Sequence, residues 1–413
     1  MNNFKRKLIT SIATGAILLN SLTPFAFANT TIEISENGSS SDNTANVSTS
    51  SNTTVVQNND ANVSNNVDAN ATTGGNDAND NTGGDVVIST GDAETNVDVS
   101  TAVNANHADV DGCNCDNDAD VLISGNGYNS DNDANLTTTN DVNVFQDNAA
   151  KISNDVDANA KTGDNDANRN TGGDTVILTG DAEASVDVEN KANANIAKVG
   201  GNNGGSDIDL RILGNGANSD NTIDLQTKQL ILLVQNNDAY VYNDIDAKAK
   251  TGGNDANDNT GGDVIINTGN AKAWVEVDNM VNFNAADVDC GCLTDVLAKI
   301  SGNGVDSDND IKAKIKKDLS VFQDNASDLY NYVDAKAKTG HNDAKRNTGP
   351  VDRIDPVEIM TGDSTSWTDV ENSGNVNVFG PKFDWWVFPE GFDFDFDFHL
   401  DLSALLSLLH HLG

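Results

Sequence analysis

The chain is poor in aromatic side chains and in positive charge. Aromatic residues make up 5 % of its 413 residues, and 24 Lys and Arg stand against 64 Asp and Glu, for a formal net charge of −40. A conventional globular enzyme fills its core with large aliphatic and aromatic residues, so this composition argues against that class. Nucleic-acid binding needs clustered Lys and Arg to neutralise phosphates, so the acidic balance argues against a nucleic-acid partner.

Apolar runs are scarce too, and the most extended one lies at the N-terminus. Residues 5–7 are basic, residues 8–19 are mostly apolar, and residues 26–28 place alanines where a signal peptidase reads small side chains. The run is too short to span a bilayer. We therefore expect residues 1–28 to be a signal peptide and the mature chain, from Asn29, to be secreted or displayed on a bacterial surface without a transmembrane span.

A period of 89 residues organises the rest of the chain. Two landmarks recur with spacings of 89, 89 and 88 residues: an apolar pair before Gln57, Gln146, Gln235 and Gln323, and Asn-Thr-Gly at Asn81, Asn170, Asn259 and Asn347. Registers that agree this closely indicate a tandem array. The expected organisation is a polar linker at 29–52, repeats at 53–141, 142–230 and 231–318, a partial repeat at 319–379, and an aromatic C-terminal cap or anchor at 380–413.

Within each repeat the local pattern predicts strands. Residues 239–251 alternate between small or apolar side chains and polar ones, which is the signature of a half-buried strand, and Gly-rich turns punctuate such runs. The predicted fold is an all-β tandem-repeat solenoid, with turns at roughly 17-residue intervals, at Gln57, Gly74, Gly91 and Gly125, giving about five short coils per repeat. About eighteen coils then make a rod on the order of 90 Å long. A string of β-sandwich domains is the alternative, but the small inward residues fill a sandwich poorly.

One asparagine recurs on the predicted inward face of a strand. The equivalent positions are Asn65, Asn154, Asn243 and Asn331. A buried amide without a partner costs about 1–3 kcal/mol, and stacked coils can satisfy it through a side-chain ladder. We expect such a ladder, with a bulge or turn at this position as the alternative.

Acidic segments are the candidate metal sites. Carboxylates at alternate positions occur in four stretches and comprise Asp116, Asp118, Asp120, Asp131, Asp133, Asp164, Asp166, Asp308 and Asp310. Calcium takes oxygen ligands of this kind, which makes it the candidate ion, although the EF-hand spacing is absent. The competing interpretation is that Asp and Asn simply form turns and a solvated acidic surface. No other cofactor is expected.

The four cysteines form two C-x-C pairs at equivalent positions of two repeats, Cys113/Cys115 and Cys290/Cys292. In a solenoid of short coils these pairs lie about 48 Å apart, too far for a shared four-thiolate zinc site. A local disulfide within each pair and a bridge to another chain both suit an exported protein, and the residues leave this choice open.

Lysines are distributed unevenly. None occurs between Lys7 and Lys151, whereas Lys312, Lys314 and Lys316 share one face of a predicted strand. Such a row guards an edge strand against unwanted pairing. The alternative is that it meets the acidic N-terminal repeats of a neighbouring molecule head to tail.

The C-terminal tail differs in composition from the repeats. From Gly380 onward the chain is rich in aromatic residues, which include Trp385, Trp386, Phe392, Phe394, Phe396 and Phe398. Large apolar side chains in a row require burial. We expect them to cap the open end of the solenoid, to anchor the chain to an envelope component, or to dock onto another subunit.

The runs Gln57-Asn-Asn-Asp-Ala61 and Gly74-Gly-Asn-Asp-Ala78 resemble curlin repeats, and the array over residues 53–379 resembles uncharacterised exported Asn/Thr/Gly-rich bacterial repeat proteins. The curlin resemblance implies an extracellular, self-assembling β-fibre; the other brings no activity. Because no nucleophile, acid–base or phosphate motif is recognisable, we expect a non-enzymatic structural or adhesive protein of the bacterial cell surface or extracellular matrix. A calcium-dependent extracellular binding module is the alternative.

Overall fold

The computed structural model describes residues 30–110, 118–200, 206–289, 294–350 and 357–380. Over these residues the chain forms sixteen β-strands and no helix. The predicted all-β class is therefore confirmed. The expected signal peptide, residues 1–28, lies outside the described residues.

The strands fall into four coils, each with one long strand and three shorter ones. Coil 1 comprises β1 (Thr30–Ser35), β2 (Asp42–Gly74), β3 (Val86–Ser89) and β4 (Ala93–Val110). Coil 2 comprises β5 (Ala119–Ser124), β6 (Asp131–Gly163), β7 (Thr175–Thr179) and β8 (Ala182–Gly200). Coil 3 comprises β9 (Ser206–Leu213), β10 (Asp220–Lys250), β11 (Val264–Thr268) and β12 (Ala271–Asp289). Coil 4 comprises β13 (Thr294–Ser301), β14 (Asp308–Lys338), β15 (Val357–Met360) and β16 (Ser364–Phe379).

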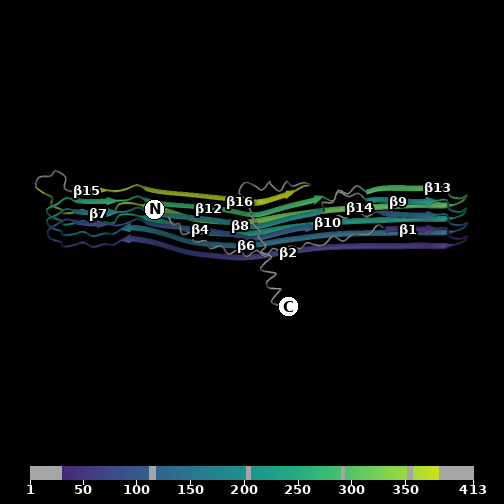
Figure 1. Ribbon diagram of the computed structural model, residues 1–413, viewed down its shortest axis with the longest axis horizontal. Helices are drawn as coiled ribbons and strands as arrows, with labels where there is room; N and C mark the ends of the chain where they lie inside the picture. Colours follow the sequence, from purple (N-terminus) through teal and green to yellow (C-terminus); the bar gives the residue numbers. More distant parts are fainter. Residues whose placement is uncertain (1–29, 111–117, 201–205, 290–293, 351–356, 381–413) are drawn as a thin grey trace, which may run out of the picture. The chain divides into compact units, whose positions relative to one another are not determined.

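Equivalent strands of the four coils pair in parallel and in register. They build four four-stranded sheets, and the largest has the order β14-β10-β6-β2. In that sheet Gln57 lies opposite Gln146, and Gln146 opposite Gln235, so the sequence repeat is also the pairing register. The predicted β-solenoid is confirmed (Figure 1). We use "column" below for the equivalent residues that lie side by side across the coils.

The coil itself is much longer than the sequence pattern predicted. One repeat makes one coil, not five, because each long strand continues through the positions that were interpreted as turns, including Gln57. The array has four coils rather than about eighteen, so the expected rod built from many short coils is wrong. The long direction lies along the strands instead, and the 33 residues of β2 extend about 110 Å.

The expected polar linker is also corrected. Residues 30–35 form β1 and residues 42–52 begin β2, and both segments pair with coil 2. Their Ser, Thr and Asn side chains gave little hydrophobic signal, because coil 1 lies at the edge of every sheet and is covered by a neighbouring coil on one side only.

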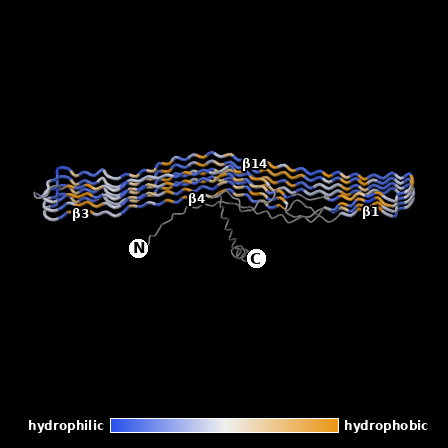
Figure 2. The backbone as a smooth tube through the Cα atoms, turned by 90° about the horizontal axis from the view of Figure 1, so that it is seen from above, coloured by the Kyte–Doolittle hydropathy of each residue, from blue (hydrophilic) through white to orange (hydrophobic). Residues whose placement is uncertain are grey.

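Each coil is a flattened loop in which the long strand faces the returning strands of the β1 and β4 types, while the strands of the β3 type face the segment that follows the long strand, as Val86 does with Ala78. Inward-pointing Val, Ala, Ile and Leu of the long strands pack against those of the return strands, as Val156 and Ala158 of β6 do against Val186 and Val188 of β8. The hydropathy therefore alternates along each strand and repeats from coil to coil (Figure 2). Small side chains allow the two layers to approach closely along the whole length.

A left-handed kink shared by the β4-type strands changes which of their residues face inward. Asn104, Asn193, Asn282 and Asn375 have φ between 57° and 64°, and pairing of the strands skips this position on both partners. Asn adopts the left-handed region at lower cost than other non-glycine residues. The kink moves the inward face from odd-numbered positions such as Val103 to even-numbered ones such as Asn106, and this brings further asparagines into the interior.

Candidate functional site

The predicted asparagine column forms a ladder through the centre of the array. The Nδ2 group of Asn65 donates to Oδ1 of Asn154 at 2.7 Å, Asn154 donates to Asn243 at 2.7 Å, and Asn243 donates to Asn331 at 2.6 Å. Asn154 and Asn243 are fully buried. No bulge occurs here, because the long strands pair without interruption through this position.

A second ladder on the facing layer completes the hydrogen bonding of the first. Asn190 of β8 donates to Asn279 of β12 at 2.8 Å, and Asn279 donates to Asn372 of β16 at 2.8 Å. The two ladders also bond to each other, since Asn154 donates to Asn190 at 3.0 Å. Each buried amide is thus held along the stacking direction and across the interior.

Sequence reasoning missed most of these ladders. Other amide columns begin at Asn37, Asn43, Gln57, Asn59, Asn76 and Asn106, and in each the amide of one coil bonds to the amide of the next. The signal was present, because Gln57 was the landmark that revealed the repeat. It was interpreted as a turn, whereas Gln146 and Gln235 are buried and also donate to backbone carbonyls of the facing layer.

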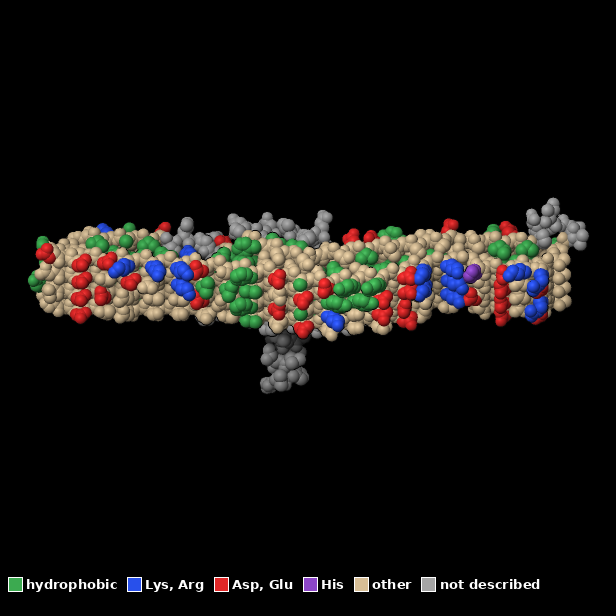
Figure 3. All heavy atoms as spheres, turned by 180° about the vertical axis from the view of Figure 1, so that it is seen from behind, with side chains coloured by type: hydrophobic (Ala, Val, Ile, Leu, Met, Phe, Trp, Pro, Cys, Tyr) green, Lys and Arg blue, Asp and Glu red, His purple; other side chains and the backbone are tan. Residues whose placement is uncertain are grey.

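Charged residues form columns on the outside of the array (Figure 3). Asp42, Asp131, Asp220 and Asp308 lie side by side at the start of the long strands. Partial burial, and then the neighbouring Asp carboxylates, raise the pKa of Asp131 and of Asp220 above the ordinary value of 3.8. Asp166 and Asp255, from a second column of aspartates at the far turn, have pKa values raised for the same two reasons.

A third column alternates in sign and has the opposite effect. Arg169 forms hydrogen bonds with both carboxylate oxygens of Asp80 at 2.6 and 2.8 Å, and Arg346 does the same with Asp258 at 2.5 and 2.7 Å. These hydrogen bonds lower the pKa of Asp80 and of Asp258. The column therefore reads Asp, Arg, Asp, Arg from coil 1 to coil 4.

These shifts predict that mild acid stabilises the fold. A carboxyl group with a raised pKa binds its proton more readily in the folded state, so its contribution is present at low pH and is lost as the pH rises through the folded pKa. Asp131, Asp166, Asp220 and Asp255 should therefore stabilise the array as the pH falls from 7 towards 4. The contribution of Asp80 and Asp258 is lost only below about 3.8, as the pH falls through their lowered pKa values.

We expect the melting temperature to rise by about 2–4 °C between pH 7 and pH 4 and to fall again below pH 3.5 or so. Thermal melts followed by circular dichroism at constant ionic strength measure this. As a control, 1 M NaCl at pH 7 screens the repulsion within columns and should also raise the melting temperature. A melting temperature that falls steadily from pH 7 to pH 4 contradicts the prediction.

The candidate calcium ligands are spread over several columns. Asp118 and Asp120 lie at the start of β5, Asp131 and Asp133 begin β6, Asp164 and Asp166 follow β6, and Asp308 and Asp310 begin β14; Asp116 lies outside the described residues. Several already have cationic partners: Asp120 bonds Arg211 at 2.9 Å, Asp310 pairs with Lys312 at 2.7 Å, and Asp164 pairs with Lys161. Within the part of the chain that the structure describes, no three His, Cys, Asp or Glu side chains are grouped to hold a metal ion. Calcium binding stays a prediction.

The row of lysines lies on an edge strand, a position that fits both the guard role and a head-to-tail contact with another molecule. Lys312, Lys314 and Lys316 project from β14, which is the outermost strand of its sheet. Lys312 and Lys316 pair with Asp310 and Asp318 at 2.7 and 2.5 Å.

Two groups of predicted residues cannot be placed. Cys113, Cys115, Cys290 and Cys292, and the tail residues Trp385, Trp386, Phe392, Phe394, Phe396 and Phe398, lie outside the described residues. The expected separation of about 48 Å between the two C-x-C pairs is nevertheless wrong, because it assumed short coils. The strands that precede them, β4 and β12, are separated in their sheet by β8 alone, not by ten coils.

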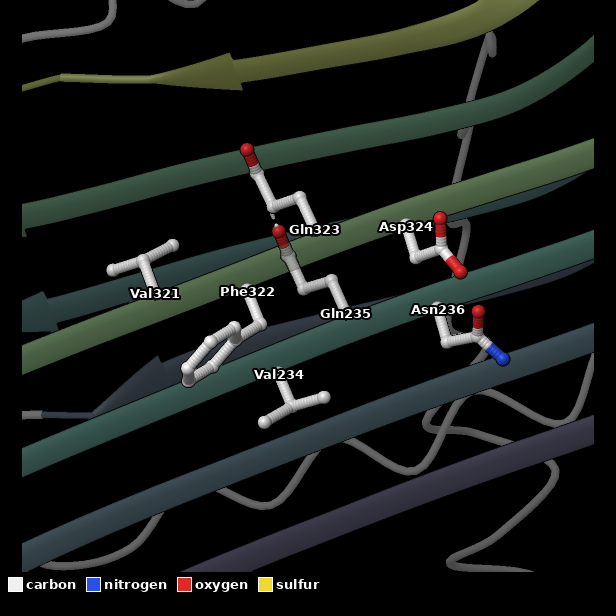
Figure 4. A pocket seen from close by; sticks show the side chains of 7 residues that line it. All are labelled: Val234, Gln235, Asn236, Val321, Phe322, Gln323 and Asp324. Carbon is white, nitrogen blue, oxygen red and sulfur yellow. Dashed lines mark hydrogen bonds between the residues drawn. The ribbon is translucent and has the colours of Figure 1, made fainter.

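Apolar and aromatic side chains also gather in columns on the surface. Trp274 stacks on Trp367 in one column with ring centroids 5.3 Å apart, and Tyr240 lies diagonally beside Tyr330 of the next coil, with tilted rings 5.7 Å apart. A shallow hollow at the outer strands β10 and β14 is lined by Val234, Gln235, Asn236, Val321, Phe322, Gln323 and Asp324 (Figure 4). Its exposed apolar wall is formed by Phe322, whose surface is 60 % accessible.

Comparisons with known proteins found no match among protein-family models, curated proteins or solved structures. The resemblances to curlin repeats and to exported Asn/Thr/Gly-rich repeat proteins therefore stay predictions. No helix among the described residues is long and apolar enough to cross a membrane.

Proposed function

We propose that the chain is an exported, non-enzymatic structural or adhesive element of a bacterial cell surface or extracellular matrix. The observation that supports this most directly is the set of buried amide ladders that join each coil to the next. A ladder such as Asn65, Asn154, Asn243 and Asn331 has little use for catalysis, but it resists sliding and separation of the coils over the whole length of the strands.

The outer surface suits adhesion. Its columns present identical or related groups at the spacing of neighbouring strands, about 4.8 Å, as with the tryptophans described above. A regular array of this kind favours weak, repeated contacts with an extended partner, such as another copy or a component of the cell envelope. Attachment to the envelope is assigned to the aromatic tail, residues 380–413, on sequence grounds.

Export is tested by expressing the whole chain in a bacterium with its own N-terminus. We expect the protein in the envelope or medium fraction, with Asn29 as its first residue. The matched control is Ala28→Asp, which places a charge where signal peptidase needs a small side chain and should leave the precursor uncleaved. An uncleaved wild-type chain that stays in the cytoplasm contradicts the proposal.

The structural role predicts folding that does not depend on calcium. The purified mature chain should give the same β-type circular dichroism spectrum and the same melting temperature in EDTA and in millimolar calcium, because its interior is held by amide ladders rather than by an ion. A cooperative melt that appears only with calcium would instead favour the calcium-dependent binding module, with the acidic segments as its ion sites.

A further inference from the structure

We propose that a second copy of this chain stacks on coil 4 through its own coil 1, in parallel and in register, so that the array continues from one molecule to the next. The inference rests on the proposed structural role and names its mode of assembly. In this arrangement β2 of the second copy pairs with β14 of the first, with Asp42 taking the place after Asp308.

The first argument is an alternation with a period of two coils in several outward-facing columns. Four columns of the long sheet read Thr44/Asp133/Thr222/Asp310, Val56/Phe145/Val234/Phe322, Asn58/Asp147/Asn236/Asp324 and Asp60/Ala149/Asp238/Ala326. The turn column Asp80/Arg169/Asp258/Arg346 follows the same rule. In these five columns coils 1 and 3 carry one type of residue and coils 2 and 4 another.

Because the period is two and the array has four coils, stacking coil 1 on coil 4 continues the alternation without a break. In these columns the new junction has the same residues as the internal junction between coils 2 and 3. That internal junction is favourable. Asn236 donates to Asp147 at 2.8 Å, and the charge of Asp258 adds to that of Asp80 in raising the pKa of Arg169. Between copies, Asn58 would meet Asp324 and Asp80 would meet Arg346.

The second argument is a buried donor at the outer side of coil 4. In one amide column Asn76 donates to Asn165 at 3.0 Å, Asn165 to Asn254 at 2.9 Å, and Asn254 to Asn342 at 3.0 Å. The Nδ2 group of Asn342 ends this series, and it is buried without a hydrogen-bond partner among the described residues. In the stacked arrangement the Oδ1 atom of Asn76 from the second copy takes the position of the acceptor.

The third argument is the charge of the two end coils. Residues 30–110 of coil 1 contain 12 Asp and Glu and no Lys or Arg, whereas residues 294–350 and 357–380 of coil 4 contain 9 Lys and Arg against 13 Asp and Glu. Lys299 of β13 would lie opposite Glu33 of the second copy, because their column reads Glu33, Leu122, Arg211, Lys299. Coil 1 is thus the more acidic end, so two coil-1 ends repel each other more strongly than a coil-1 end and a coil-4 end do.

The backbone of β2 is available for pairing at its outer edge, whereas on β14 the outward N–H and C=O of Ala337 already bond Ser366 and Ser364. Alternate residues of a parallel strand direct their N–H and C=O groups to opposite neighbours. The N–H of Asp131 bonds the carbonyl of Ser41, and the N–H of Gly75 bonds that of Gly163, so odd-numbered residues of β2 face coil 2. Even-numbered residues of β2, Thr54 among them, direct their N–H groups to the open edge.

Register is tested by disulfide trapping between two variants of the mature chain. Ser50→Cys and Lys316→Cys lie in one column, so in the stacked arrangement their Cα atoms are about 4.8 Å apart, within the range of a disulfide. The two variants are mixed, allowed to assemble in 0.15 M salt and oxidised, and linked peptides are identified by mass spectrometry. The control pairs Ser50→Cys with Lys336→Cys, which is displaced along the same strand and should not be linked.

Edge pairing is tested by Thr54→Pro. The side chain of Thr54 points outward, and the N–H that proline removes faces the open edge, so the coil should fold normally while the edge can no longer pair. We expect an unchanged melt and at least about a tenfold loss of assembled material by sedimentation. Thr54→Ala, which keeps the N–H, should assemble like the wild type.

The proposal is supported by the specific cross-link between positions 50 and 316 together with the loss of assembly in folded Thr54→Pro. It is overturned by a chain that stays monomeric at all concentrations, by links only in another register, or by folded Thr54→Pro that assembles normally. These results are separate from those for export and calcium, because an exported, calcium-independent element need not stack head to tail. The cross-link also decides the question if Thr54→Pro fails to fold.

Discussion

Replacing Asn154 by alanine should lower the free energy of unfolding by about 2–5 kcal/mol, although it removes only a polar side chain. Asn154 accepts a hydrogen bond from Asn65 and donates to Asn190 and Asn243 in the interior of coil 2. Its removal takes bonds from three buried amides at once and leaves a cavity beside them. The loss should therefore exceed that of an ordinary single hydrogen bond.

The matched control is Asn159→Ala on the same strand, where the side chain is exposed. This change should alter stability by no more than about 0.5 kcal/mol. Urea denaturation of both variants, compared by the transition midpoint, measures the difference. Equal midpoints would show that the ladder contributes nothing beyond the packing of the strands.

The repeat length and the ladder position were predictable from the sequence because both depend on identical residues at equivalent positions of the repeats. Identical landmarks 89 residues apart correspond to strands that pair in register, and an asparagine among small inward residues has few ways to be satisfied other than by its own equivalents. Because equivalent strands pair in parallel and in register, two residues that are one repeat apart in the sequence are neighbours in the sheet.

The size of the coil was not predictable in the same way. Glycines at Gly74, Gly91 and Gly125 all look like turns locally, but Gly91 lies at the short connection between β3 and β4, where the chain continues along the same layer. The chain reverses near Gly83 and Gly125 but not at Gly74, because Thr73 already donates to the carbonyl of Gly91 and Ala78 packs with Val86. Nothing local distinguishes a corner from a reversal, since the difference lies in which distant strand covers the segment.

The two-coil alternation was missed for the opposite reason. Comparison of repeats looks for identical residues, so positions such as Val56, Phe145, Val234 and Phe322 appear to be variable surface sites. The alternation is recognisable only when the coils are stacked, because a large side chain then lies between two smaller ones in its column. The same holds for the acidic segments: spacing along the chain suggested shared ions, whereas the actual neighbours of each Asp are its equivalents in the adjacent coils.

Replacing Gly163 by alanine should be among the most destabilising single substitutions in the array. Gly163 has a φ of 105°, which side chains rarely adopt, and a Cβ there would lie 2.1 Å from the carbonyl oxygen of Gly252 in the next coil. That oxygen belongs to the backbone and accepts the N–H of Asp164, so neither group can move without opening the turn. We expect a loss of about 3 kcal/mol or more, since backbone strain and a broken inter-coil bond add to each other.

Gly75→Ala separates the steric effect from the cost of the backbone conformation. Gly75 also has a positive φ, 69°, but a Cβ there meets nothing within 4 Å, and the equivalent position in coil 2 is already occupied by Asp164 at a φ of 51°. This variant should lose only about 1 kcal/mol. If the urea midpoints of Gly163→Ala and Gly75→Ala agree, the close approach of the coils is not what fixes the turn. If only Gly163→Ala has a lower urea midpoint, glycine is required at this turn because the backbones of consecutive coils contact each other there. The same close contact is needed for a further coil, or a further molecule, to be added in the same register.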